Sequence, residues 1–254
     1  MKSRKQVIEE TVSNIKLDWL TGEVRILPSE MDHVQIVQYM NNRFPDKKMA
    51  QVVQQSGMLH ILDGRKRSLI GFNLNTTTLE VYLPKKKLHS ITINGTGSHL
   101  YVQALEAQMF KIQLTSSHAT VTGGSCDKCE INAVGTNFIG EDVEIQELNL
   151  CATSSKVEIS GELSEIHANS TGRGIKIQSS IVPCNIQSVS TGAGVTLGIP
   201  ENDGFVLEFQ KVSGHLKSDF PLIPQGRSYT YKDGGKLYRA EVRGGRFSLQ
   251  KTIL

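Results

Sequence analysis

Apolar residues recur at a regular spacing along most of this chain. Seven anchor positions lie 18 to 21 residues apart: Leu100, Ala119, Phe138, Val157, Ile175, Val195 and Leu216. The positions nine and seven residues before each anchor and two residues after it are mainly apolar, with polar residues between them. Because the side chains of a β-strand alternate between its two faces, this spacing predicts two short strands per repeat, each with one buried face.

A small residue lies three positions before every anchor, and the residue preceding it is always Thr or Val. These small residues are Gly97, Ser116, Gly135, Ser154, Gly172, Gly192 and Ser213. Small residues suit a bend between two strands, so these positions are the predicted bends. Two strands and two bends in about 19 residues leave no room for a helical crossover. The repeat therefore predicts an all-β protein, a β-solenoid whose coils stack roughly 4.8 Å apart.

The same spacing extends towards both ends of the chain. It fits Ile15, Leu17, Thr21, Val24 and Ile26 near the start, and Tyr238, Ala240, Gly244, Phe247 and Leu249 near the end. We therefore expect one domain over residues 1–254, in which 91–218 form regular coils. Residues 1–90 are expected to hold an N-terminal coil with capping hairpins, and 219–254 a C-terminal hairpin and the last coil. Capping is expected because open strand edges at the ends of a solenoid invite aggregation.

Local signals indicate how the ends are capped. Asp63-Gly64 and Asp233-Gly234 predict two hairpin turns, the second between Tyr229–Tyr231 and Leu237. The segment 3–11 is the best helix candidate and is expected to be a short cap. The basic runs 65–67 and 85–87 are expected to be solvated charges that discourage edge pairing, the alternative being contact with phosphate or an anionic membrane surface.

Composition narrows the classes of partner. The 254 residues include 28 Lys and Arg against 25 Asp and Glu, a formal net charge of +3, which argues against a nucleic-acid partner. Hydrophobic residues make up 38%, without a long apolar run, so neither disorder nor membrane insertion is expected. The N-terminal segment has no apolar stretch of signal-peptide length, and we expect a cytoplasmic protein.

The four cysteines include a pair with the spacing of a redox or metal-binding motif, Cys126-x-x-Cys129. The repeat places Cys129 in a buried row and Cys151 on an outward position, and ligands on opposite faces cannot share one ion. We therefore expect free, structural thiols, with a redox-active pair as the alternative.

Two sets of surface residues are candidates for binding. His99 and His118 immediately precede successive anchors and are predicted neighbours, either a solvated edge or a pair that binds metal or responds to pH. Asn94, Asn132 and Asn169 each lie six residues before an anchor, and stacked amides there predict a structural ladder or a polar face for a carbohydrate or protein. The chain has no nucleophile elbow, P-loop, dinucleotide fingerprint or HExxH motif, so neither catalysis nor a cofactor is expected.

Several segments, taken in order, resemble the bacterial family called domain of unknown function 4097, whose members are labelled as adhesins. They are NIKLDWLTGEVRI, LEVYLP, TGAGVTLGIP, VSGHLKSDFP and AEVRGGRFSLQK. The resemblance implies a solenoid-like β-fold and a link to the cell envelope or to stress, and it supplies no catalytic residues. We therefore predict a non-enzymatic scaffold that binds another protein or itself. The alternatives are a carbohydrate-binding or carbohydrate-active solenoid and a cytoplasmic partner in envelope-stress signalling.

Overall fold

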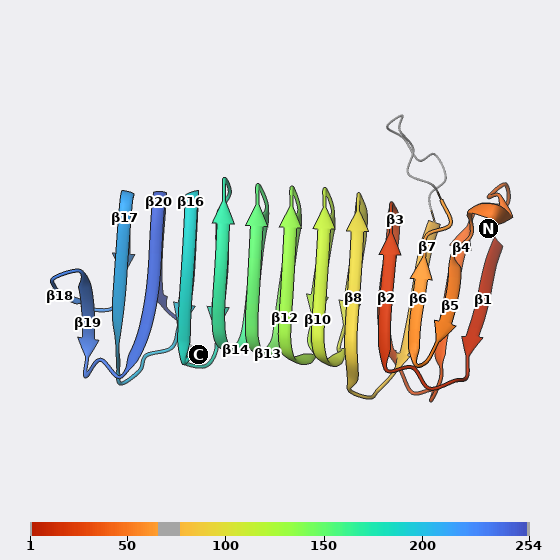
Figure 1. The fold of residues 1–254 in the computed structure, drawn as a ribbon, viewed down its shortest axis with the longest axis horizontal. Coiled ribbons are helices and arrows are strands. Elements are labelled where there is room, and N and C mark those ends of the chain that lie inside the picture. Colours follow the sequence, from red (N-terminus) through yellow and green to blue (C-terminus); the bar gives the residue numbers. More distant parts are fainter. Residues whose placement is uncertain (1, 66–76, 253–254) are drawn as a thin grey trace.

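The protein is an elongated stack of β-strands, seen from the side in Figure 1. The computed structural model describes residues 2–65 and 77–252. Within them there are twenty strands and one short 3-10 helix, Asp46–Lys48. The predicted β-solenoid, with hairpins at its ends, is confirmed.

The strands fall into three groups along the chain. The N-terminal group comprises β1 (Lys2–Ile8), β2 (Asn14–Trp19), β3 (Gly22–Ser29), β4 (Val34–Met40), β5 (Gln51–Gln55), β6 (Met58–Leu62) and β7 (Thr77–Pro84). The middle group comprises β8 (Leu88–Thr96), β9 (Ser98–Gln103), β10 (Glu106–Thr115), β11 (His118–Thr122), β12 (Ser125–Val134), β13 (Asn137–Thr153), β14 (Lys156–Thr171), β15 (Ile175–Ser179) and β16 (Asn185–Ile199). The C-terminal group comprises β17 (Gly204–Ser218), β18 (Ile223–Gln225), β19 (Ser228–Lys232) and β20 (Lys236–Lys251).

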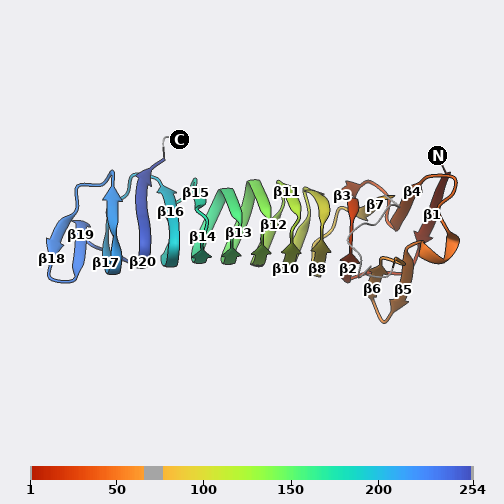
Figure 2. The same ribbon diagram turned by 90° about the horizontal axis from the view of Figure 1, so that it is seen from above.

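Each coil contributes one longer and one shorter strand segment, and equivalent segments of neighbouring coils pair in parallel. The view from above shows the two rows facing each other (Figure 2). The pairing keeps the predicted register: Ile112 lies opposite Ile93 and Ile131, and Ala119 lies opposite Leu100 and Phe138. The coil near the start joins the same stack, with Ile15 opposite Ile91 and Val24 opposite Leu100.

The core is a narrow aliphatic column between the two rows of strands. Six of the seven anchors are buried, the exception being the half-buried Leu216. Phe138, the largest anchor, has small neighbours: Ala119 is its partner in the adjacent coil, and Gly140 occupies the next inward position of its own strand. Large and small side chains thus alternate, which keeps the interior filled without widening it.

A ladder of buried hydroxyls runs through the bends of four coils. The backbone N–H of Ser98 donates to Ser117 Oγ at 3.2 Å, that of Ser117 to Thr136 Oγ1 at 3.4 Å, and that of Thr136 to Ser155 Oγ at 3.0 Å. The hydroxyls of Ser117, Thr136 and Ser155 each donate in turn to the carbonyl oxygen two residues earlier in their own coil. Polar backbone at the bends is thereby satisfied without water.

The N-terminal end differs from the expectation in two respects. The helix expected over 3–11 is wrong: Lys2–Ile8 is strand β1, which pairs antiparallel with β4 over seven residues. A continuous strand partner outweighs the weak helical preference of this segment. The hairpin expected at Asp63-Gly64 is also wrong, because β6 pairs with β5 and β2, and the observed turn lies at Ser56-Gly57 between β5 and β6.

The C-terminal end has a strand order that does not follow the sequence. Strand β20 lies between β16 and β17, with Phe247 opposite both Val195 and Leu216. The hairpin expected at Asp233-Gly234 is therefore wrong, since β19 pairs with β17 and β18. The observed hairpin joins β18 to β19, where Gln225 lies opposite Ser228.

Arg65 is buried, not solvated as expected for the first basic run. Its guanidinium makes an ion pair with Asp63 at 2.6 Å, lies 5.3 Å from the centre of the Trp19 ring, and donates to Thr21 Oγ1 at 3.1 Å. Both members of the ion pair are almost fully enclosed. The other two residues of that run, 66 and 67, lie outside the described residues. Arg65 therefore fastens the end of β6 to the bend between β2 and β3.

Candidate functional site

The predicted bend residues have the backbone conformation that explains their size. Gly97, Gly135, Gly172 and Gly192 have φ between 57° and 83°, and Ser116 and Ser154 have φ of 50°. Ser213 is the exception: Gly214 takes the positive φ of 136° there, and the pairing of β17 with β20 shifts register at this point. These positions shape the coil and bring no chemistry together.

His99 and His118 lie side by side on β9 and β11. They are direct partners in the parallel pairing, and their ring centroids are 5.1 Å apart. Both are exposed. The residues that the structure describes contain no group of three His, Cys, Asp or Glu side chains that could hold a metal ion. The arrangement is thus a pair of stacked imidazoles on the surface.

The amide row has the predicted register, with Asn94 opposite Gln113, Gln113 opposite Asn132 and Cys151 opposite Asn169. At the N-terminal end of the row, Asn94 makes a hydrogen bond with a residue that is not an amide: its Nδ2 donates to Asp18 Oδ1 at 2.6 Å. Asp18 also contacts His60 at 2.5 Å. Partial burial opposes ionisation of Asp18, yet the hydrogen bonds with Asn94 and His60 leave its pKa below the ordinary value.

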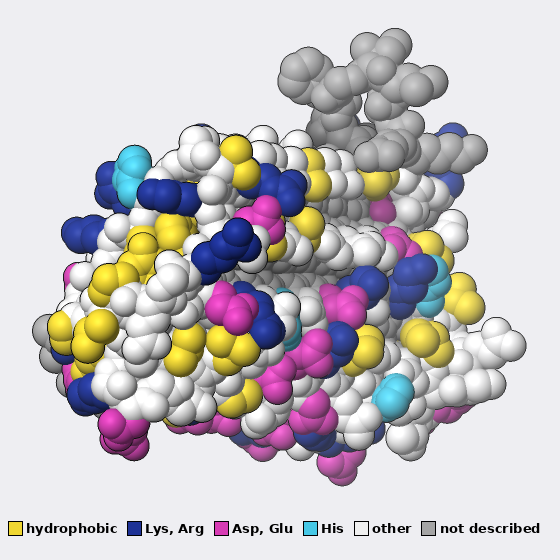
Figure 3. Space-filling model, turned by 60° about the vertical axis from the view of Figure 1, so that its left-hand side comes forward, with side chains coloured by type: hydrophobic (Ala, Val, Ile, Leu, Met, Phe, Trp, Pro, Cys, Tyr) yellow, Lys and Arg dark blue, Asp and Glu magenta, His cyan; other side chains and the backbone are white. Residues whose placement is uncertain are grey.

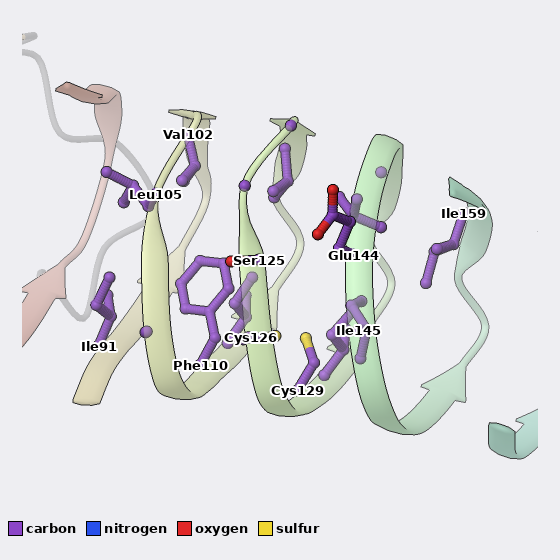
Figure 4. Close-up of a pocket in the computed structure, with 18 of the residues that line it drawn as sticks. Ile91, Val102, Leu105, Phe110, Ser125, Cys126, Cys129, Glu144, Ile145 and Ile159 are labelled. Carbon is purple, nitrogen blue, oxygen red and sulfur yellow. The ribbon is translucent and has the colours of Figure 1, made fainter. Parts of the chain in front are cut away.

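Cys126 and Cys129 both face the interior from one strand, β12. Cys126 lies opposite Ala107 and Cys129 opposite Phe110, and two consecutive outward residues between them turn the strand at a corner. Figure 4 shows the two side chains beside the ring of Phe110. The interaction between the two thiols lowers the pKa of Cys126 and, together with burial, raises that of Cys129. Cys151 and Cys184 are exposed, and all four are free thiols.

The cysteine pair borders a small cavity of about 30 Å³ in the middle coils (Figure 4). Its lining is almost entirely apolar and includes Ile91, Phe110 and Ile159. A water molecule needs two to four polar partners, so a space of this kind stays dry. The cavity is a small packing defect beside two buried thiols.

The second basic run is paired with acids. Lys87 contacts Asp127 at 2.7 Å, and Lys85 contacts Glu30. The run thus connects the loop between β7 and β8 to the turn after β3 and to strand β12.

Strand β5 is a surface feature that the repeat did not predict. Within the described residues it pairs only with β6, so its other edge has no strand partner in this part of the chain. Gln51, Val53 and Gln55 form its exposed face, and Val53 is 51% exposed. The lack of charged residues in this strand was visible in the sequence, but its place at the end of the stack was not.

A sequence profile of the Toastrack DUF4097 family matches residues 12–236. The chain belongs to this family. None of the curated proteins matches it. Among the described residues there is no helix long and apolar enough to cross a membrane.

Solved structures of low sequence identity resemble this Toastrack chain over nearly its whole length. One is a protein from Bacteroides fragilis assigned as an adhesin, with 12% identity, a TM-score of 0.49, and coverage of 99% of this chain and 97% of that one. Another, from Clostridium sporogenes, is assigned as a cell adhesion protein, with 11% identity, a TM-score of 0.37, and coverage of 99% and 100%. An assigned adhesin from Parabacteroides merdae has 12% identity, a TM-score of 0.44, and coverage of 99% and 97%.

Proposed function

We propose that this Toastrack protein is a non-enzymatic binding module that associates with a second copy of itself through strand β5. The proposal is carried by the uncharged edge of β5, which has no strand partner among residues 2–65 and 77–252, and by the exposure of Val53 at its centre. An exposed strand edge is a template for pairing with another chain.

Two other strand edges at the ends are protected by means that β5 lacks. Strand β1 carries Lys2, Arg4 and Lys5, and charges on an edge oppose pairing. Strand β18 contains Pro224, which has no N–H to donate to a neighbour. Within β5, Gln51–Gln55, no residue is charged and none is proline.

The sequence of β5 is suited to pairing with itself. A two-fold axis through Val53 would set two β5 strands antiparallel and place Val53 opposite its own copy. Gln51 would then lie opposite Gln55 of the second copy, so amides meet amides and no like charges are opposed. The exposed faces of the two strands would then lie side by side on one continuous sheet.

The test is the oligomeric state of the full chain, measured by size-exclusion chromatography with light scattering over a range of concentrations. The wild type is expected to form dimers. Val53→Lys is expected to be monomeric, because it sets two like charges opposite each other at the two-fold axis. The control is Val212→Lys, at the other end of the molecule, where the side chain is 82% exposed. A wild-type monomer at every concentration, or a Val53→Lys dimer of unchanged stability, would refute the proposal.

The proposal includes a reducing location such as the cytoplasm. It is supported by the four free thiols, since oxidising compartments favour disulfides in proteins of this kind. Fractionation of cells carrying the tagged, full-length natural protein tests this part separately, and recovery outside the cytoplasm would contradict it.

A further inference from the structure

A long groove crosses the shorter strand segments near the C-terminal end. It has a volume of about 700 Å³. It spans five consecutive segments, because Val157 pairs with Ile175, Ile175 with Val195, Val195 with Phe247, and Phe247 with Leu216. Four steps between parallel strands amount to roughly 19 Å, long enough for several units of an extended polymer.

The groove exists because two adjacent positions in the middle of one row of outward-facing residues are glycines, which have no side chain. The residues immediately before these five anchors are, in spatial order, Lys156, Gly174, Gly194, Arg246 and His215. A Cβ atom built on Gly194 would meet no atom within 4 Å, so the space above this residue is open. The two glycines form a floor of exposed backbone between Lys156 on one side and Arg246 on the other.

The lining of the groove is basic. It contains Lys156, Lys176 and Arg246 against one carboxylate, Glu158. Glu158 is paired with Lys156 at 2.7 Å, and the hydrogen bond from this lysine lowers the Glu158 pKa. Among the described residues, neither Lys176 nor Arg246 forms an ion pair within 4 Å, although Glu158 lies opposite Lys176 in the strand pairing and is attracted to it at longer range. Figure 3, which brings this end forward, shows Lys and Arg side chains with a histidine along the upper edge, while acidic side chains gather mostly on the lower edge.

We propose that this groove binds a linear polyanion, a chain that carries phosphate or carboxylate groups at regular intervals. Lys176 and Arg246 would neutralise charges at separate points along such a chain, and the glycine floor would let the chain approach the backbone. The lining contains no Phe, Tyr or Trp, which disfavours a ligand recognised mainly by stacking of bases. The proposal is independent of self-association, because β5 lies at the opposite end of the molecule (Figure 1).

The test measures binding of the full-length protein to two polyanions, fluorescently labelled inorganic polyphosphate and labelled polygalacturonate, with labelled dextran as the neutral polymer. We expect binding to at least one polyanion, weakening steeply as salt rises, and no binding to dextran. The two polyanions show whether the groove prefers phosphate or carboxylate groups.

Two variants locate the site. Lys176→Glu/Arg246→Glu is expected to weaken binding by about tenfold or more, because it reverses two charges of the groove. Its matched control is Lys5→Glu/Arg227→Glu, which makes the same change in net charge at two exposed positions outside the groove. Gly194→Glu fills the groove without a backbone clash and is expected to weaken binding as well.

Binding to neither polyanion would overturn the proposal. It would also be overturned if the groove variants and the matched control weakened binding equally, since that result would reflect net charge alone. Thermal unfolding of each variant shows that a loss of binding is not a loss of folding. Gly194→Glu provides a second test if the double charge reversal destabilises the protein.

Discussion

Two adjacent serines at one bend have opposite effects on stability: the backbone of Ser154 is strained, whereas the side chain of Ser155 makes a buried hydrogen bond. Ser154 has a φ of 50°, in the left-handed region that is unfavourable for a residue with a Cβ. Ser155 is fully buried, and its hydroxyl accepts the backbone N–H of Thr136. The sequence repeat identified the first position as a bend. A hydroxyl residue also recurs at the second position in four successive coils, but this spacing does not reveal that the bend turns these side chains inward.

Substitution of these two serines is expected to change stability in opposite directions. Ser155→Ala leaves the buried N–H of Thr136 without an acceptor and should lower the free energy of unfolding by about 1–3 kcal/mol. Ser154→Gly relieves the left-handed strain and should be neutral or stabilising by up to about 1 kcal/mol. Urea denaturation of both variants and the wild type measures these changes. Equal destabilisation by both would show that the ladder contributes nothing specific.

At the scale of strands, the spacing of apolar residues predicted the regular coils well and the ends poorly. Period-two alternation determines which residues face inward, so the register of Ile93, Ile112 and Ile131 follows from the sequence alone. The two Asp-Gly pairs were misleading because a turn signal does not specify which strand pairs with which. Arg65 was expected at the surface, since its ion pair with Asp63 and its contact with Trp19 arise only once β2 and β6 are adjacent.

Some candidate sites could be predicted from the sequence repeat and others could not. The neighbouring positions of His99 and His118 follow directly from the repeat. The edge of β5 and the groove do not, because both depend on the order in which strands stack. Gly174 and Gly194 border a groove next to Arg246 only because β20 returns to pair with β16.

Glu201 connects the loop between β16 and β17, in which it lies, to strands β19 and β20. These contacts make the stability of the C-terminal end sensitive to pH. It contacts Lys232 of β19 at 2.8 Å, Lys251 of β20 at 2.6 Å, and the hydroxyl of Tyr231. Hydrogen bonds from Lys232, Lys251 and Tyr231 lower its pKa from 4.5 to about 2. A lowered pKa in the folded state means that the stabilisation is present above pH 4.5 and is lost as the pH falls towards about 2.

Glu201→Gln tests this link between elements. The variant should melt at a lower temperature than the wild type at pH 7, with a modest difference because the site is exposed to solvent. The difference in Tm should narrow as the pH is lowered from about 4.5 to 2, since the wild-type carboxylate becomes protonated over that interval. Scanning calorimetry across this pH range makes the measurement. A difference that stays constant with pH would contradict a role for the charge of Glu201.

At the scale of the whole molecule, the insertion of β20 between β16 and β17 changes how the solenoid holds together. In a solenoid whose coils stack in sequence order, each coil contacts only its neighbours, and the last one can unfold without disturbing the rest. Here β17 is paired with β20 and β19 but not with β16. Although β17 precedes β20 in the sequence, it is therefore connected to the stack through β20. The last segment of the chain therefore closes the C-terminal end.

This arrangement predicts that a defect in β20 will spread to residues that precede it in the chain. Val242 of β20 is fully buried, and Val242→Asp places an unpaired charge in the core, at a cost of about 3–5 kcal/mol. Hydrogen exchange should then lose protection in both β20 and β17, while the coils from β8 to β14 stay protected. Val7→Asp in the edge strand β1, where the side chain is 43% exposed, serves as the control and should affect only its own end. If β17 kept its protection while β20 lost it, the C-terminal end would be held by the contacts of β17 with β19 alone, and β20 would not be the element that closes the stack.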